Sequence, residues 1–241
     1  MTFTSENWTG TKRILVILAH PDDPEFFCGA TIARWTSTGH IVSYCLLTRG
    51  DKGEKDFNVT TDEVARKREK EQLAAAAILN VKSVRFLNQP DGYLVPDMAL
   101  RREVVRVIRQ EKPDILMTCD PTNYFSNDSV INHPDHRAAG QVVIDAAFPA
   151  AGSAFFFPDL LVREGLEPHS LKEVWMSVTS QPNTILDITE FWEKKITALK
   201  EHKSQIGNSE EFEKRMRTRR SPESSEEAPR FEERFRRIVY G

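Results

Sequence analysis

The chain has 241 residues, of which 39% are hydrophobic and 29% charged, with a formal net charge of −3 and a pI near 6.1. This composition is typical of a globular protein with a full core, and we expect residues 1–241 to form one α/β domain. The slightly acidic balance gives no reason to expect nucleic-acid binding, and no segment is long and apolar enough for a membrane span. Residues 1–10 lack the basic and apolar parts of a secretory signal, which favours a cytoplasmic protein.

Cysteine usage supports the same compartment. The three cysteines, Cys28, Cys45 and Cys119, are an odd number and include no C-x-x-C pair. A disulfide framework needs paired cysteines, so we expect reduced thiols. Cys28 and Cys119 could lie near the site, but free cysteines usually behave as small hydrophobic side chains, and buried packing is therefore the role expected of these two.

Strand-like apolar runs alternate with helix-like segments through the first two thirds of the chain. The runs typical of strands are residues 13–18, 41–47, 83–87 and 114–119. The segments with apolar residues at helical spacing are residues 27–37, 63–79, 98–110 and 133–148. This alternation predicts a Rossmann-like, mostly parallel sheet flanked by helices.

The last third of the chain is less regular. It contains two expected strands at 173–179 and 184–187 and an expected helix from 189 to about 205. Residues 209–230 are densely charged and predict a solvated helix followed by a flexible linker. A nucleic-acid or membrane patch is the alternative, but neighbouring acidic residues offset most of the basic charge. Residues 231–240 regain aromatic and aliphatic side chains, and we expect them to dock back as a helix.

The first motif that indicates chemistry is A-H-P-D-D-P-E at residues 19–25, directly after the first predicted strand. The carboxyl ends of strands in open α/β sheets are where ligands bind. His20, Asp22 and Asp23 place an imidazole and two carboxylates within four residues. Carboxylates that close raise each other's pKa unless a cation or a proton lies between them. Because imidazole and carboxylate are usual zinc ligands, the motif predicts a metal site.

A second cluster, H-P-D-H at residues 133–136, follows the fourth predicted strand and begins a helix. His133 and His136 are three residues apart, so they share one helix face. If the first and fourth strands are neighbours, His136 can reach a metal held by His20 and Asp23. Three protein ligands and one open position are typical of a catalytic zinc site. Histidine and carboxylate ligands also suit Fe²⁺ and other divalent ions.

The same motifs supply candidates for proton transfer. A zinc-bound water has a pKa near neutrality and is a nucleophile at pH 7. Asp22 is adjacent to the expected ligand Asp23, but consecutive side chains diverge, which leaves it free to act as general base. His133 can donate to a developing oxyanion or to a leaving amine. Asp135 would fix the tautomer of His133 or of a ligand imidazole.

Two acidic residues of the first motif have simpler explanations. Asp22 could serve only as the N-cap of the following helix. Glu25 is favoured at a helix start by the helix dipole alone, so we assign it no chemistry.

Together the two motifs resemble the signature of the PIG-L/LmbE-like family of metal-dependent N-deacetylases. Shorter stretches that also resemble this family are Leu47-Thr48-Arg49-Gly50, Arg68-x-x-Glu71, Asp91-Gly92, the K-x-x-A-x-x-x-H-x-S-Q run from Lys195 to Gln205, and Glu233-Arg234-Phe235. The resemblance spans nearly the whole chain, and the two metal motifs are its most specific part.

The resemblance implies a Rossmann-like fold and hydrolysis of an N-acetyl group on N-acetylglucosamine or one of its conjugates. It implies His20, Asp23 and His136 as zinc ligands. It also implies Asp22 as the base and His133 as the group that faces the tetrahedral intermediate.

Two further residues take a role only from the resemblance. It implies that Arg68 and Asp91 hold sugar hydroxyls or a neighbouring acidic group. A salt bridge of Arg68 with Glu71 or another neighbour, and a plain turn role for Asp91, are equally good explanations.

We therefore predict a zinc-dependent hydrolase that uses activated water to deacetylate a small amino-sugar substrate. Family members are often oligomeric, but this sequence fixes no assembly. The alternatives are a metal-dependent hydrolase of a different amide or ester, and a non-catalytic sugar- or nucleotide-binding Rossmann module. The second is disfavoured, because no G-x-G-x-x-G follows the first strand and carboxylates there would repel a pyrophosphate.

Overall fold

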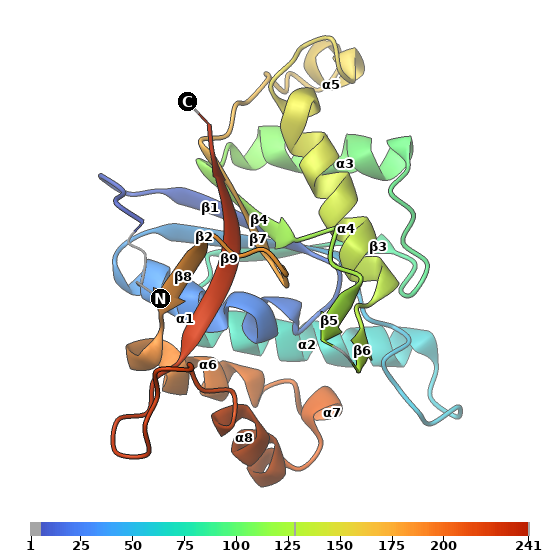
Figure 1. Cartoon of the computed structure of the whole chain (residues 1–241). Coiled ribbons are helices and arrows are strands. Elements are labelled where there is room, and N and C mark those ends of the chain that lie inside the picture. Colours follow the sequence, from blue (N-terminus) through green and yellow to red (C-terminus); the bar gives the residue numbers. More distant parts are fainter. Residues whose placement is uncertain (1–5, 128, 241) are drawn as a thin grey trace.

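The computed structural model describes residues 6–127 and 129–240, in which a seven-stranded sheet has the order β3-β2-β1-β4-β7-β9-β8 (Figure 1). The parallel strands are β1 (Arg13–Leu18), β2 (Ile41–Thr48), β3 (Ser83–Gln89), β4 (Ile115–Cys119) and β7 (Glu173–Ser177). The antiparallel strand β9 (Glu232–Val239) lies between β7 and β8 (Thr184–Asp187). The predicted mostly parallel α/β sheet is confirmed.

Helices cover both faces of this sheet (Figure 1). One face packs against α1 (Asp23–Ser37), α2 (Thr61–Ile78) and α6 (Trp192–Leu199). The other face packs against α3 (Met98–Glu111) and α4 (Pro134–Asp145). The shorter helices are the π-helical turn Ala146–Ala151, α5 (Pro158–Val162), the 3₁₀ turn Thr189–Phe191, α7 (Lys203–Ile206) and α8 (Ser209–Arg217).

The central strand β1 contributes to both cores. Ile14, Val16 and Leu18 point into the core under α1, whereas Leu15 and Ile17 point into the core under α4. A strand buried on both faces is an almost continuous apolar run, as in other parallel sheets. Full burial of each such side chain contributes roughly 1.5–3 kcal/mol, so the carboxyl end of β1 is held firmly.

Strand β4 pairs with β1 in parallel, with Ile14 opposite Ile115 and Val16 opposite Met117. The condition on which the two-motif prediction depended is therefore met. After β4, Gly140 lets α4 approach the sheet closely, since a Cβ at this position would overlap the carbonyl oxygen of Cys119. The close approach brings the start of α4 to the same sheet edge as the end of β1.

The predicted helix at residues 231–240 is wrong, because this segment forms β9. Phe231, Glu233 and Phe235 are buried, and Arg234 between them is exposed, which is the two-residue period of a strand. Phe231 and Phe235 are four residues apart, a spacing that also fits a helix. Because the buried residue between them is the polar Glu233, the alternation of apolar and polar residues typical of a strand is not visible in the sequence.

Other boundaries also differ from expectation. The helix expected from 189 to about 205 is interrupted, giving a 3₁₀ turn, α6 and α7. The expected loop 120–132 contains the two-stranded hairpin of β5 (Phe125–Asn127) and β6 (Val130–Ile131). The charged segment 209–230 begins with α8, which buries Phe212 and Met216 and is exposed along most of its remaining surface.

Two bulk predictions can be compared with the structure. Cys28 and Cys119 are buried, as expected, and Cys45 is buried as well; all three are free thiols. Within residues 6–127 and 129–240, no helix combines the length and the apolar character needed to cross a bilayer.

Candidate active site

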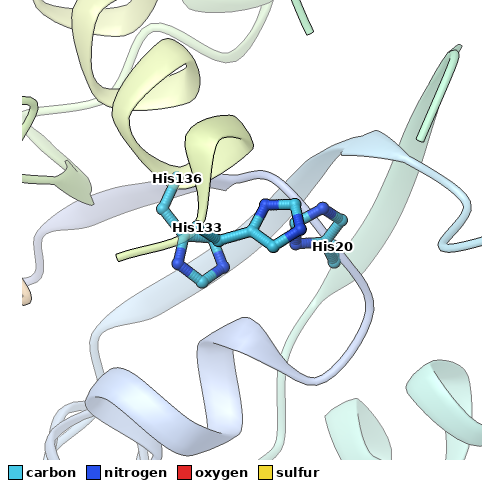
Figure 2. Close-up of side chains that lie close together, drawn as sticks. All are labelled: His20, His133 and His136. Atoms are coloured by element: carbon cyan, nitrogen blue, oxygen red, sulfur yellow. The ribbon is translucent and has the colours of Figure 1, made fainter. Parts of the chain in front are cut away.

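The two sequence motifs meet at one edge of the sheet. His20 follows β1, and His133 and His136 come from the start of α4, after β4. Figure 2 shows the three imidazoles gathered together, and their candidate ligand nitrogens all lie within 4.8 Å of one another. They line a pocket of about 540 Å³. The other residues that line it are Asp22, Asp23, Phe26, Phe27, Lys52, Gly53, Arg68, Asp91 and Gly92.

Asp23 lies between two of these histidines. Its Oδ1 is 3.0 Å from His136 Nε2, and its Oδ2 is 3.4 Å from His20 Nδ1. The backbone N–H of His20 also donates to Oδ2 at 2.8 Å. Burial favours the neutral acid, but the charges and hydrogen bonds of His136 and His20 hold the pKa of Asp23 well below its ordinary value. The carboxylate is therefore ionised between two imidazoles.

The outer nitrogens of both imidazoles face oxygen acceptors. His20 Nε2 is 3.1 Å from Asp91 Oδ1 and 3.2 Å from Asp135 Oδ2. His136 Nδ1 is 3.0 Å from the side-chain oxygen of Asn132. A nitrogen that donates outward leaves the other ring nitrogen with a free lone pair, as is usual for metal-ligating histidines. That other nitrogen is the one nearer Asp23 in both rings.

The donor set fits a divalent metal. Two imidazole nitrogens and an ionised carboxylate are a usual zinc set. Burial alone would lower the pKa of His20, but the charge of Asp23 and hydrogen bonds to Asp135, Asp23 and Asp91 raise it to about 12. The carboxylates around His20 therefore favour a positive charge at this place, which either a protonated imidazole or a bound cation would provide.

Asp91 and Asp135 form a second possible ligand group with His20. Both carboxylates, however, already accept backbone hydrogen bonds. Asp135 accepts from Gly92 at 2.7 Å and from Leu94 at 3.2 Å, and Asp91 accepts from Lys52 at 2.9 Å. Asp91 and Asp135 are therefore better suited to orient the His20 ring through its Nε2 than to hold a metal themselves.

Asp22 has an unusual backbone. Its φ of 84° lies in the left-handed region, and its side chain makes no capping hydrogen bond, so the N-cap explanation fails. Arg68 donates to Asp22 Oδ2 at 3.2 Å and also binds the carbonyls of Pro21 and Gly50. Burial raises the pKa of Asp22 to about 6, although Arg68 acts in the opposite direction. A carboxyl with this pKa can exchange protons near neutrality.

His133 is the N-cap residue of α4, and its Nδ1 accepts the backbone N–H of Asp135 at 3.1 Å. Burial and the neighbouring His20 and His136 lower the pKa of His133, which favours the neutral ring. A neutral imidazole that accepts at Nδ1 carries its proton on Nε2. His133 is thus a hydrogen-bond donor in the pocket.

Three buried residues of the site were not predicted from the sequence, or were predicted to have no role. Asn132 orients His136, Gln72 accepts the backbone N–H of Asp22 at 2.8 Å, and Glu25 accepts from Gln72. Asparagine and glutamine carry no motif of their own, so only spatial proximity identifies them. Of the salt bridges considered above for Arg68, the one with Glu71 does not form in the part of the chain described, where Glu71 binds Ser204. Arg68 instead pairs with another neighbour, Asp22.

Comparisons with known proteins find similar deacetylases. A relative from Thermococcus kodakarensis, named diacetylchitobiose deacetylase, is 37% identical over 202 residues, covering 84% of this chain and 73% of its own length. A relative from Thermobispora bispora, a 1D-myo-inositol 2-acetamido-2-deoxy-alpha-D-glucopyranoside deacetylase, is 31% identical over 73% of this chain and 61% of its own length.

Solved structures show the same fold. The N,N'-diacetylchitobiose deacetylase of Pyrococcus horikoshii has a TM-score of 0.84 and 31% identity, covering 95% of this chain and 84% of that chain. GalB, a 4-carboxy-2-hydroxymuconate hydratase from Pseudomonas putida, has a TM-score of 0.73 at 22% identity over 96% of this chain and 98% of that chain, a likeness of fold alone.

The family model for GlcNAc-PI de-N-acetylases, PIG-L, matches residues 15–147, a segment that contains both histidine motifs. More than half of the chain is matched. The chain belongs to the PIG-L family, as the two motifs had indicated.

Proposed function

We propose that this protein is a zinc-dependent N-deacetylase that hydrolyses the acetamide of an N-acetylglucosamine-type sugar. The observation that carries the proposal is the position of Asp23 between His20 and His136, with Asp22 beside them in the same pocket. Family membership and the names of the relatives support the reaction class and the sugar type. The two rival readings, a different amide or ester substrate and a binding module, lack such support.

His20, Asp23 and His136 would hold the metal. When bound, the metal would act as a Lewis acid and lower the pKa of water. Asp22 accepts the proton of the attacking water. Its raised pKa also lets the same carboxyl return that proton to the leaving amine. Arg68 holds the Asp22 carboxylate in place during both transfers.

His133 faces the developing oxyanion through its Nε2–H. A donor fixed before the reaction needs no reorganisation when charge develops, which is the main advantage of an oxyanion hole. The backbone N–H of Asp135 donates to His133 Nδ1 and so keeps the His133 proton on Nε2. The Asp135 carboxylate contacts His20 Nε2 and orients that ring.

Arg68 and Asp91 are proposed to bind sugar hydroxyls. Both line the pocket. Arg68 also places a guanidinium charge at the pocket wall, where it attracts hydroxyl oxygens or an acidic group of the substrate. Asp91 contacts His20 through Oδ1 and Lys52 N–H through Oδ2, and each carboxylate oxygen keeps a second lone pair that can accept from a sugar hydroxyl.

The first test is metal content by elemental analysis, together with free-amine release from N,N'-diacetylchitobiose and N-acetylglucosamine before and after chelation. We expect one zinc per chain and amine release that a chelator abolishes and zinc restores. The Asp22→Asn variant should keep the metal and lose activity, whereas Asp145→Asn, far along α4, should keep both. A protein that binds no zinc or iron after reconstitution, or amine release insensitive to chelation, would refute the proposal.

Zinc as the native metal and a cytoplasmic location are parts of this proposal. The three free, buried cysteines fit a reducing compartment. A homo-oligomer stays a prediction that sedimentation analysis decides.

A further inference from the structure

A chain of buried polar residues ends at the backbone of Asp22. It begins at His202, the N-cap residue of α7, whose Nε2 lies 3.0 Å from Glu25 Oε2. Both Glu25 oxygens accept from Gln72 Nε2, at 3.1 and 3.0 Å. Gln72 Oε1 in turn accepts the backbone N–H of Asp22 at 2.8 Å. His202, Glu25 and Gln72 are each 0% exposed.

The chain has a fixed direction. A glutamine amide has one accepting and one donating end and can be turned either way. Both Glu25 oxygens lie within hydrogen-bond distance of Gln72 Nε2, so the amide nitrogen lies on the Glu25 side. The Gln72 oxygen must then face the Asp22 N–H. His202, whose Nε2 faces the Glu25 carboxylate, fixes the carboxylate in turn.

The far end of the chain is anchored. Ser204, two residues after His202, donates to Glu71 through its backbone N–H and its hydroxyl, at 2.9 and 2.6 Å. Glu71 precedes Gln72 on α2. The Nδ1 of His202 is buried and makes no hydrogen bond to the described residues. Within residues 6–127 and 129–240, the contact with Glu25 is therefore the one hydrogen bond that the His202 ring makes.

Helix α2 holds Asp22 from two sides. Arg68 and Gln72 are four residues apart and lie on one helix face. Arg68 binds the carboxylate of Asp22, and Gln72 binds its backbone N–H. The backbone of Asp22 lies in the left-handed region, which residues other than glycine, asparagine and aspartate rarely adopt. Loss of the Gln72 contact would let this peptide rotate and redirect the carboxylate.

We propose that Gln72, Glu25 and His202 are positioning residues that hold the Asp22 backbone and thereby aim its carboxylate at the attacking water. This inference rests on the proposed deacetylation. A misplacement of about 1 Å can lower a rate by about 100-fold, so such residues can influence kcat without touching substrate.

The test compares Gln72→Met, His202→Leu and His202→Gln in the zinc-loaded protein, with His169→Leu as control. Methionine keeps the volume of Gln72 but neither accepts nor donates in this geometry. The glutamine amide nitrogen in His202→Gln can replace the donor toward Glu25, whereas leucine cannot. His169 also makes an imidazole hydrogen bond, to the carbonyl of Pro113, and does not line the pocket.

We expect Gln72→Met and His202→Leu to lower kcat about 10- to 100-fold, with KM and zinc content near wild type. Both variants should also lower Tm, because each leaves a buried polar group without its partner, so kcat is measured below the onset of unfolding of each variant. His202→Gln should recover most of kcat, and His169→Leu should leave it unchanged. Unchanged kcat in Gln72→Met would overturn the inference. So would activity lost only in parallel with zinc content or with the fraction of unfolded protein, which indicates a purely structural role.

A crystal structure of Gln72→Met decides the question independently of activity. We expect the Asp22 φ to leave the left-handed region or its carboxylate to turn from the pocket. An unchanged Asp22 refutes the inference. If Gln72→Met does not fold, His202→Leu and His202→Gln carry the same structural test. If the wild-type protein releases no amine from either sugar, the proposed function fails, and the structures still decide whether this chain positions Asp22.

Discussion

A buried ion pair bridges an interruption in α1, and its loss should destabilise the whole fold. Cys28, with φ −149° and ψ 17°, breaks the helix. In a straight helix the Ala30 N–H would bond to the Phe26 carbonyl. Here Glu233 of β9 accepts from Ala30 at 3.2 Å, and Lys195 of α6 donates to Phe26 O at 2.8 Å. Lys195 and Glu233 are 2.6 Å apart, with side chains 5% and 4% exposed.

The expected magnitude follows from this burial. Lys195→Met leaves Glu233 with no cationic partner and the Phe26 carbonyl without its donor. Removal of one partner of a buried pair typically destabilises by about 3–5 kcal/mol. At about 2–4 °C per kcal/mol for a chain of this size, Tm should fall by roughly 6–20 °C. The double variant Lys195→Met/Glu233→Gln removes both charges, so it should lose less stability than the sum of the two single variants.

The assay is reversible denaturation in urea, with the midpoint and slope fitted for each variant. The matched control is Lys200→Met, which removes a lysine from a pair with Glu213 whose side chains are 37% and 27% exposed. An exposed pair contributes about 0.2–1 kcal/mol, so this control should stay close to wild type. If Lys195→Met loses no more stability than Lys200→Met, the ion pair does not support the interrupted helix and the reasoning is wrong.

Three further predictions concern the pocket. Asn132→Ala removes the acceptor that orients His136 and should weaken zinc binding about 10- to 100-fold in a chelator competition; equal affinity would exclude this role. His133→Ala should lower kcat about 100- to 1,000-fold with zinc content and KM retained, and a KM effect alone would assign His133 to substrate binding instead. Gly50→Ala places a Cβ over Arg68 Nη1 at a φ of +66° and should lower kcat/KM by at least about 10-fold. Gly10→Ala, at the same φ but with no atom within 4 Å, is its control and should keep wild-type activity.

The parts of the fold visible in the sequence are those in which local pattern and burial coincide. The β1 run is apolar at every position that reaches the core, and the following His20 and Asp23 can be placed at a strand end without tertiary information. The prediction that His136 reaches them needed only one assumption, the adjacency of β1 and β4. That adjacency is what the sheet order shows.

The parts that could not be predicted depend on pairing between distant segments. Glu233 can occupy an inward position of β9 because Lys195 and two free N–H groups of α1 donate to its carboxylate. No local sequence pattern predicts these partners. Glu25 was explained by the helix dipole alone, yet it is fully buried against Gln72 and His202. Buried polar residues follow the hydrogen-bond needs of their neighbours, which a single sequence does not display.

These two buried clusters contact different parts of α1. The ion pair of Lys195 and Glu233 acts at the break near Cys28 and joins α1 to α6 and β9. The hydrogen bonds of Gln72 and Glu25 act before the break, on the turn that carries Asp22. Since the interruption separates the turn from the rest of the helix, strain held at Asp22 need not propagate into the core. We therefore expect variants of the first cluster to lower the free energy of unfolding with kcat retained, and variants of the second to lower kcat as well.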